Sequence, residues 1–132
     1  MLIAAVVLSV LHIIISFVFN KNLTLFTLGY VWHRPQSITS IILLIFIAII
    51  SYLMYQLQFT VYSIIVWALI LQFIPAWNGI NSAYNKARSE SAKMALDPAL
   101  QGMRDYHVRR ATSTNEELKQ EVIKYYKLNK YN

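Results

Sequence analysis

The sequence of 132 residues contains no cysteine, and its first two-thirds contain no acidic residue. The absence of cysteine excludes disulfides, thiolate nucleophiles and cysteine-ligated metals. No Asp or Glu precedes Glu90. Residues 1–85 therefore offer no carboxylate dyad, no two-metal site and no acid to carry a transported ion. Their only formal charges are those of Lys21 and Arg34.

The sequence contains long stretches without any charged residue. Charged residues make up 14% of the sequence, against about 25% in an average globular protein. The stretch Ser37–Trp77 has none at all. Because a bilayer core of about 30 Å needs roughly 20 helical residues, this stretch is two spans long. Polar residues in Gln56–Thr60 interrupt it and predict a tight turn between helices over 37–56 and 60–77.

A third apolar run, 2–20, precedes these two and is predicted to be the first transmembrane helix. A cleaved signal peptide fits it poorly, because no basic residue precedes it and it lacks a small-residue cleavage site. Residues 21–36 then hold Tyr30 and Trp32, aromatic types that settle at headgroup level, and predict a loop on the membrane surface. The predicted fold class is an all-α integral membrane protein with three transmembrane helices.

Residues 78–132 are predicted to form a helical tail outside the bundle of residues 1–77. The tail carries ten basic and six acidic side chains. Apolar residues recur at helical spacing from Ile80 to Ala95, which predicts an amphipathic helix that either lies on the bilayer or continues into the cytoplasm. Asp97-Pro98 predicts a helix restart, and the capping box Thr114–Glu117 predicts a short last helix.

The distribution of basic residues predicts the orientation, because Lys and Arg accumulate on the cytoplasmic side. The first loop carries Lys21 and Arg34, the predicted turn carries none, and the tail carries ten. All three segments place the N-terminus outside and the tail in the cytoplasm. The abundance of Ile, Lys, Asn and Tyr points to the plasma membrane of a low-GC bacterium, although an organelle membrane fits the same composition.

Two polar residues at bilayer depth are candidates for a contact inside the bundle. His12 lies near the middle of the first span, and Gln72 lies in the third. Ionisable groups at this depth are costly and often functional, so a His12–Gln72 contact is one prediction. The alternative is a structural neutral imidazole bonded to Ser9, Ser16 or the backbone.

The basic residues beside the membrane are candidates for binding anionic headgroups, each worth roughly 1 kcal/mol near an anionic surface. They are Arg34, Lys86, Arg88, Lys93, Arg104, Arg109 and Arg110. The alternative is that these charges only enforce the orientation. Acidic residues offset more than half of the tail's positive charge, so nucleic acid is not an expected partner.

An apolar stripe on the last predicted helix is the candidate for docking a partner. Its members are Leu118, Val122 and Tyr125. A helix of ten to twelve residues is marginal alone in water and needs a surface to lie against. That surface is either the helix predicted over 98–110 or another subunit.

No catalytic or cofactor motif is present, so we expect a non-enzymatic protein without cofactor or metal. The expected function is that of an accessory or assembly subunit of a larger membrane complex, whose tail contacts a cytoplasmic partner or anionic lipid. In outline, three spans with a charged cytoplasmic tail resemble the three-span phage holins, which implies a homo-oligomeric pore as one alternative. A small channel or sensor that uses His12 is another.

Overall fold

The computed structural model describes residues 1–30 and 33–130, and their side chains except those of 122 and 125–130. The elements are all helical in this part of the chain. They are α1 (Leu2–Thr27), α2 (Ile38–Gln56), α3 (Val61–Leu96), the 3-10 helix η1 (Pro98–Met103), α4 (Arg104–Thr112) and α5 (Asn115–Lys130). Helices α1, α2 and α3 are each long and apolar enough to cross a membrane. The predicted all-α fold class with three candidate spans is confirmed.

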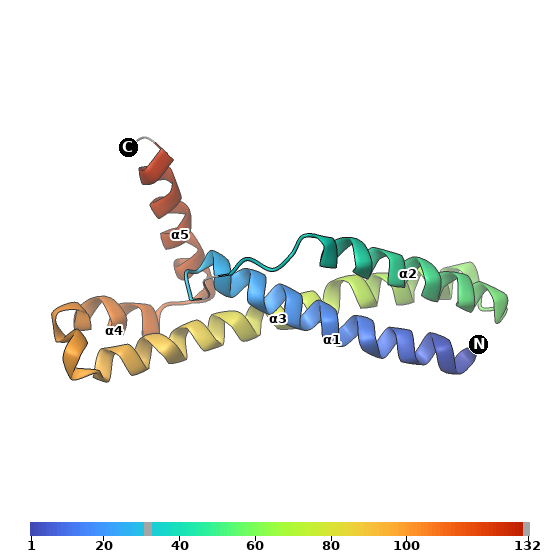
Figure 1. The fold of residues 1–132 in the computed structure, drawn as a ribbon, viewed down its shortest axis with the longest axis horizontal. Coiled ribbons are helices and arrows are strands. Elements are labelled where there is room, and N and C mark those ends of the chain that lie inside the picture. Colours follow the sequence, from blue (N-terminus) through green and yellow to red (C-terminus); the bar gives the residue numbers. More distant parts are fainter. Residues whose placement is uncertain (31–32, 131–132) are drawn as a thin grey trace.

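The three long helices lie side by side and alternate in direction along the chain (Figure 1). The predicted turn between the second and third spans is confirmed, since α2 ends at Gln56 and α3 begins at Val61. Thr60 caps α3 by accepting a hydrogen bond from the Ser63 backbone N–H at 3.2 Å. Gln58 makes the reversal with a positive φ of 65°.

Helix α1 is longer than the predicted span, because it continues past residue 20 to Thr27. The chain then turns at Gly29, whose φ of 87° is open to glycine at little cost. The segment predicted as a surface loop, 21–36, is thus helical in its first part. Trp32, one of its aromatic residues, lies outside the described residues.

Helix α3 is the longest of the described elements, and the other helices contact it. Its 36 residues rise about 54 Å and pass through Pro75 without a break. The first half packs in the bundle, and the second half extends beyond it, where α4 folds back alongside (Figure 1). The predicted amphipathic segment is therefore the continuation of the third span and not a separate helix.

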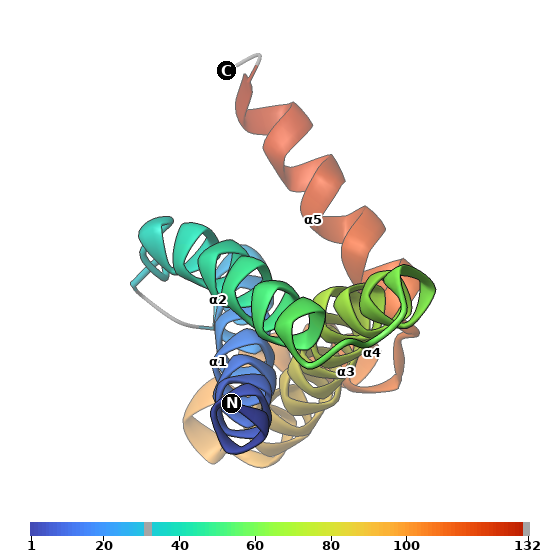
Figure 2. The same cartoon turned by 90° about the vertical axis from the view of Figure 1, so that its right-hand side faces the viewer.

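Both helix starts predicted in the tail occur. The Asp97 carboxylate accepts a hydrogen bond from the Ala99 N–H at 2.9 Å where η1 begins. The Thr114 hydroxyl accepts one from the Glu117 N–H at 3.2 Å where α5 begins. Helix α5 is longer than predicted and projects away from the bundle (Figure 2).

One seam of small buried residues runs along α3 from Pro75 to Ala95. Every fourth residue from Pro75 onward is small and buried, and α1 packs more closely on α3 than on α2. These residues are Pro75, Gly79, Ala83, Ala87, Ser91 and Ala95. A Cβ atom at Gly79 would lie 2.5 Å from the Phe17 carbonyl oxygen and 3.2 Å from the Lys21 nitrogen. The close approach of α1 and α3 therefore depends on the missing side chain.

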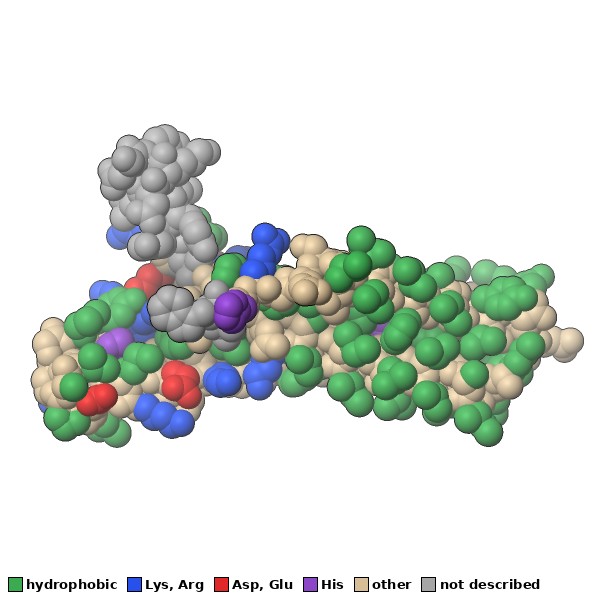
Figure 3. Space-filling model, viewed as in Figure 1, with side chains coloured by type: hydrophobic (Ala, Val, Ile, Leu, Met, Phe, Trp, Pro, Cys, Tyr) green, Lys and Arg blue, Asp and Glu red, His purple; other side chains and the backbone are tan. Residues whose placement is uncertain are grey.

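The two ends of the molecule differ in surface chemistry. Hydrophobic side chains cover the end formed by α1, α2 and the first half of α3, whereas charged side chains gather at the end that carries α4 and α5 (Figure 3). Lys21 and Arg34 belong to the charged end because α1 ends and α2 begins there. This division gives the molecule an apolar band and a polar extension.

Candidate functional site

His12 is completely buried, and neither of its ring nitrogens has a hydrogen-bond partner among the described residues. The predicted contact with Gln72 does not form. The predicted serine partners are bonded elsewhere, since Trp67 Nε1 donates to the Ser9 hydroxyl at 3.3 Å and Asn20 Nδ2 donates to the Ser16 carbonyl at 2.8 Å. His12 is thus a buried polar group whose hydrogen-bonding capacity the described part of the chain leaves unused.

Gln72 instead lies at a small polar cavity where the three long helices meet. The cavity has a volume of about 140 Å³, and its polar residues are Ser16, Asn20, Ser40 and Gln72. The Gln72 side chain is exposed and makes no hydrogen bond with the described residues. Gln72 is therefore an exposed amide, without a hydrogen-bond partner among the described residues, in the apolar part of α3.

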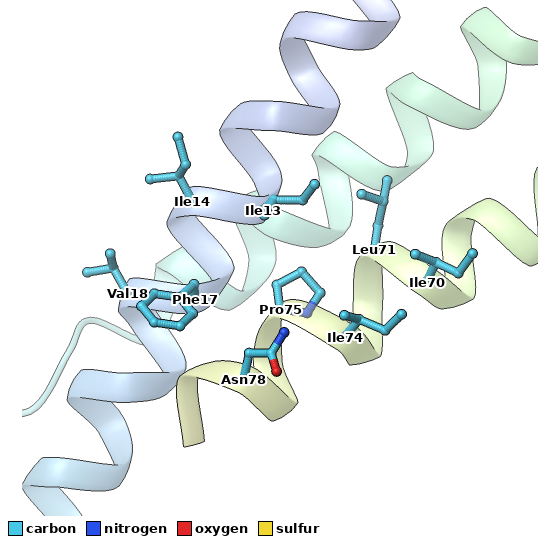
Figure 4. Close-up of a pocket in the computed structure, with 9 residues that line it drawn as sticks. All are labelled: Ile13, Ile14, Phe17, Val18, Ile70, Leu71, Ile74, Pro75 and Asn78. Atoms are coloured by element: carbon cyan, nitrogen blue, oxygen red, sulfur yellow. The ribbon is translucent and has the colours of Figure 1, made fainter. Parts of the chain in front are cut away.

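A second hollow lies on the outer surface of the bundle between α1 and α3 (Figure 4). Its volume is about 500 Å³, and its aliphatic walls include Ile13, Val18 and Ile74. Asn78 is its one polar lining residue. The chemistry of this groove is that of a surface for acyl chains or for another apolar helix.

The structure separates the seven basic candidates into different environments. Arg88 donates to the Asn85 and Asn115 side-chain oxygens, which ties α3 to the start of α5. Lys93 lies 3.7 Å from the Glu90 carboxylate, and Arg109 lies 3.4 Å from that of Glu121.

The other four basic candidates make no ion pair with the described residues. Arg34 and Arg104 are exposed. Lys86 and Arg110, in contrast, come together at one hollow next to the end of α1. Two of the seven candidates thus share a site.

We call this hollow the boundary cavity. It has a volume of about 540 Å³, and its lining residues are Leu25, Gly29, Tyr30, Lys86, Glu90, Met94, His107 and Arg110. Segments far apart in the sequence build it: the end of α1, the second half of α3, and α4.

Arg110 is the most constrained residue of the boundary cavity. Its guanidinium carbon lies 5.0 Å from the centre of the Tyr30 ring and 5.6 Å from that of Tyr106, within the range of cation–π contacts. It donates to the Tyr106 hydroxyl at 3.0 Å and to the Leu28 carbonyl at 3.4 Å. The guanidinium is therefore held in place by neutral groups and not by a carboxylate.

Two further residues of the boundary cavity were missed by sequence reasoning. His107 is only 8% exposed, and its Nδ1 has no hydrogen-bond partner among the described residues. The Tyr30 hydroxyl lies 2.5 Å from that of Ser91 and fixes the loop after α1 to α3. The spacing of His107 and Arg110, three residues apart on one helix, was a usable signal, whereas Tyr30 had been interpreted only as an aromatic residue at headgroup level.

The predicted docking stripe on the last helix needs a correction. Leu118 is not available to a partner, because it is 1% exposed and packs against Leu28 and Ala87 of its own chain. The side chains of Val122 and Tyr125 lie outside the described residues. Packing of α5 onto the chain itself was one of the two predicted arrangements, but its surface is formed by α3 and the end of α1.

The described residues contain no group of three His, Asp or Glu side chains placed to hold a metal ion. No protein-family model matches the chain, and comparisons with curated proteins and with solved structures find no significant match. The function must therefore be argued from the cavities and surfaces themselves.

Proposed function

We propose that this protein is a non-catalytic accessory or assembly subunit that packs in the bilayer beside a larger membrane protein. The observation that carries the proposal is the exposed amide of Gln72 within the apolar part of α3. Lipid cannot satisfy its donors and acceptor, whereas a polar side chain of a neighbouring helix can. Such interhelical hydrogen bonds contribute about 0.6–2 kcal/mol each.

The surface around Gln72 supports the same proposal. Only 22%, 17% and 17% of the apolar windows of α1, α2 and α3 are buried inside the chain. A bundle that buries so little of itself leaves broad faces for lipid or protein. The apolar groove between α1 and α3 adds a concave surface on which a partner's helix can pack (Figure 4).

The proposed orientation places the charged end in the cytoplasm. Lys21, Arg34 and the basic tail lie at the same end of the bundle, in agreement with the positive-inside rule. Helix α5 then projects into the cytoplasm, where its exposed charged side chains can contact a partner or anionic lipid (Figure 2). The proposed location is the plasma membrane of a bacterium.

The test is a gentle detergent extraction of the tagged protein, with mass spectrometry of what copurifies and a measurement of particle size. We expect a larger membrane protein at fixed stoichiometry. Gln72→Leu removes the exposed amide and should release that protein. The matched control Phe73→Leu changes a neighbouring side chain that is 63% exposed but apolar, and it should retain the partner.

Two results would contradict the proposal. If Gln72→Leu and wild type retain the same partner equally, the amide does not make the contact. If the particle contains only copies of this chain in a ring, a homo-oligomeric pore of holin-like architecture replaces the accessory subunit. The size of the particle separates these two outcomes.

A further inference from the structure

The boundary cavity combines a confined cation, a free cation and a buried imidazole next to the end of a membrane-spanning helix. We propose that it binds a phosphate group, carried either by an anionic lipid headgroup or by a small soluble phosphate ester. This inference does not rest on the accessory-subunit proposal, because it concerns a different surface and a different ligand.

The charge of the cavity favours an anion. Lys86 and Arg110 face a single carboxylate, that of Glu90, which lies 3.7 Å from the Lys93 ammonium. Within the described residues, Lys86 and Arg110 make no ion pair. A cation partly removed from water without a counter-ion is destabilising, and an anion that enters the cavity relieves that cost.

The available hydrogen-bond donors fit a phosphate. Arg110 gives two of its N–H groups to the Tyr106 hydroxyl and the Leu28 carbonyl, so three of its five remain, of which the one on Nε is buried. The Lys86 side chain is exposed at the rim and brings a flexible ammonium with three donors. Guanidinium and ammonium groups together are a recurring means of holding phosphate oxygens.

His107 supplies a further contact from the inner wall of the cavity. Its Nδ1 is buried and unpartnered within the described part of the chain. The Tyr106 ring packs edge-on against the His107 ring, with 5.3 Å between the ring centres, and this contact limits the movement of both side chains. An imidazole adapts to an anion as a donor, so it completes a set of three nitrogen-bearing side chains from two helices.

The walls of the cavity are already in place, which lowers the cost of binding. The hydrogen bond between Tyr30 and Ser91 joins the loop after α1 to α3, and the Tyr30 and Tyr106 rings hold the Arg110 guanidinium between them. Fewer side chains must then be ordered when a ligand arrives. This preorganisation distinguishes the cavity from exposed Arg34 and Arg104, which have no such support from the described residues.

The cavity is positioned so that either an anionic lipid headgroup or a soluble phosphate ester can bring a phosphate group to it. Lys86 lies nine positions beyond Trp77 in the sequence, which is about 13 Å along α3, whereas Leu25 lies only about 6 Å along α1 beyond Lys21. The headgroup layer adds about 5–7 Å to each side of the hydrocarbon core. The wall at Leu25 on α1 is thus level with lipid phosphates, and the wall at Lys86 on α3 reaches into water.

The experiment uses the full chain in two formats. Binding to neutral phosphatidylcholine vesicles with and without phosphatidic acid tests the lipid source. Titration of the protein in neutral detergent with inorganic phosphate and with glycerol phosphate tests the soluble source. Tighter binding to the phosphatidic acid vesicles alone identifies a headgroup site, and saturable binding of the soluble probes identifies a phosphate-ester site.

Four variants connect the binding to the cavity. Arg110→Gln should weaken binding about tenfold or more, since a charge-assisted hydrogen bond is lost, and Lys86→Gln should weaken it by about threefold to tenfold. Glu90→Gln removes the competing carboxylate and should strengthen binding. Arg104→Gln removes the same charge at an exposed site outside the cavity and should leave binding unchanged.

The proposal is overturned if no phosphate-bearing probe binds above the neutral background. It is also overturned if Arg104→Gln weakens binding as much as Lys86→Gln, because a diffuse basic surface then explains the affinity. If the Arg110→Gln variant loses its helical signal, its binding result cannot be used. Lys86→Gln, at an exposed position, and Glu90→Gln, with the opposite expected effect, then still test the proposal. Retention of a membrane partner is unaffected by any of these results.

Discussion

The two halves of α3 use the same packing pattern in two different surroundings. Buried residues recur at every fourth position of α3 from Leu71 to Ala95, and from Pro75 onward they are small. This stripe meets α1 at Gly79, and it meets Leu28 and Leu118 at Ala87. The outward faces differ: Phe73 and Trp77 are exposed on the first half, whereas Lys86 and Lys93 are exposed on the second. Small side chains thus allow the helices to pack closely, whereas the exposed face of each half matches its surroundings: it is apolar on the first half and charged on the second.

The difference also appears in how polar groups are satisfied. Around the second half, several polar side chains are bonded across elements, as Tyr30 is to Ser91 and Arg88 is to Asn115. Within the bundle, His12 and Gln72 have no partner in the described residues. Both regions keep buried polar atoms without a partner among the described residues, but His107 and Arg110 line a polar cavity, whereas His12 lies inside the apolar bundle.

Leu118→Ala should break the extension and leave the bundle intact. Leu118 is 1% exposed between Leu28 and Ala87, so its truncation creates a cavity that costs about 2–5 kcal/mol. Limited proteolysis and amide hydrogen exchange should show faster opening of α5 with unchanged protection of α1 and α2. The control is Ile123→Ala on the same helix, 39% exposed, which should change little. Equal effects of both substitutions would mean that α5 is not docked through Leu118.

Gly79→Ala should act on the bundle, where α1 and α3 approach most closely. The added Cβ meets the Phe17 carbonyl oxygen at 2.5 Å, and backbone must move to make room. We expect a loss of about 1–3 kcal/mol in unfolding free energy, measured by denaturant titration in micelles with circular dichroism. Gly102→Ala is the matched control, because nothing lies within 4 Å of the new Cβ atom. A loss of stability in the control alone would refute the close contact.

His12→Leu should have the smallest effect and the opposite sign. It replaces an imidazole without a partner in the described residues by an apolar side chain, which should raise the unfolding free energy by about 1 kcal/mol. Ser9→Ala removes the hydrogen bond from Trp67 and should instead lower it by about 0.6 kcal/mol. Destabilisation by His12→Leu in micelles would show that His12 has a partner outside the described residues, and it would favour the sensor alternative.

Local sequence signals predicted the helices well. The uncharged runs located three spans, the polar interruption at 56–60 located the turn, and Asp97 and Thr114 marked two helix starts. The end of α1 was placed too early, because the polar residues after Phe19 resemble a boundary although the helix continues to Thr27. The end of an apolar run indicates where a helix becomes polar, but the helix itself can continue beyond that point.

The candidate sites were predicted only in part. Lys86 and Arg110 were among seven basic candidates, but their common cavity depends on how α4 folds back on α3. The spacing of His107 from Arg110 was a signal that was not used, and Tyr30 was interpreted only as an aromatic residue at headgroup level. Leu118 was a candidate either for docking a partner or for packing on its own chain, since an apolar stripe does not reveal which surface covers it, and the structure shows that its own chain buries it.

The sequence by itself determined how many helices are long and apolar enough to cross a bilayer, and where they turn. These properties are sums over neighbouring residues, so they do not depend on distant parts of the chain. The tertiary structure alone decided that Gly79 meets the backbone of α1, that His12 is left without a partner in the described chain, and that Arg110 lies between Tyr30 and Tyr106. Each of these depends on contacts between residues far apart in sequence, which only packing brings together.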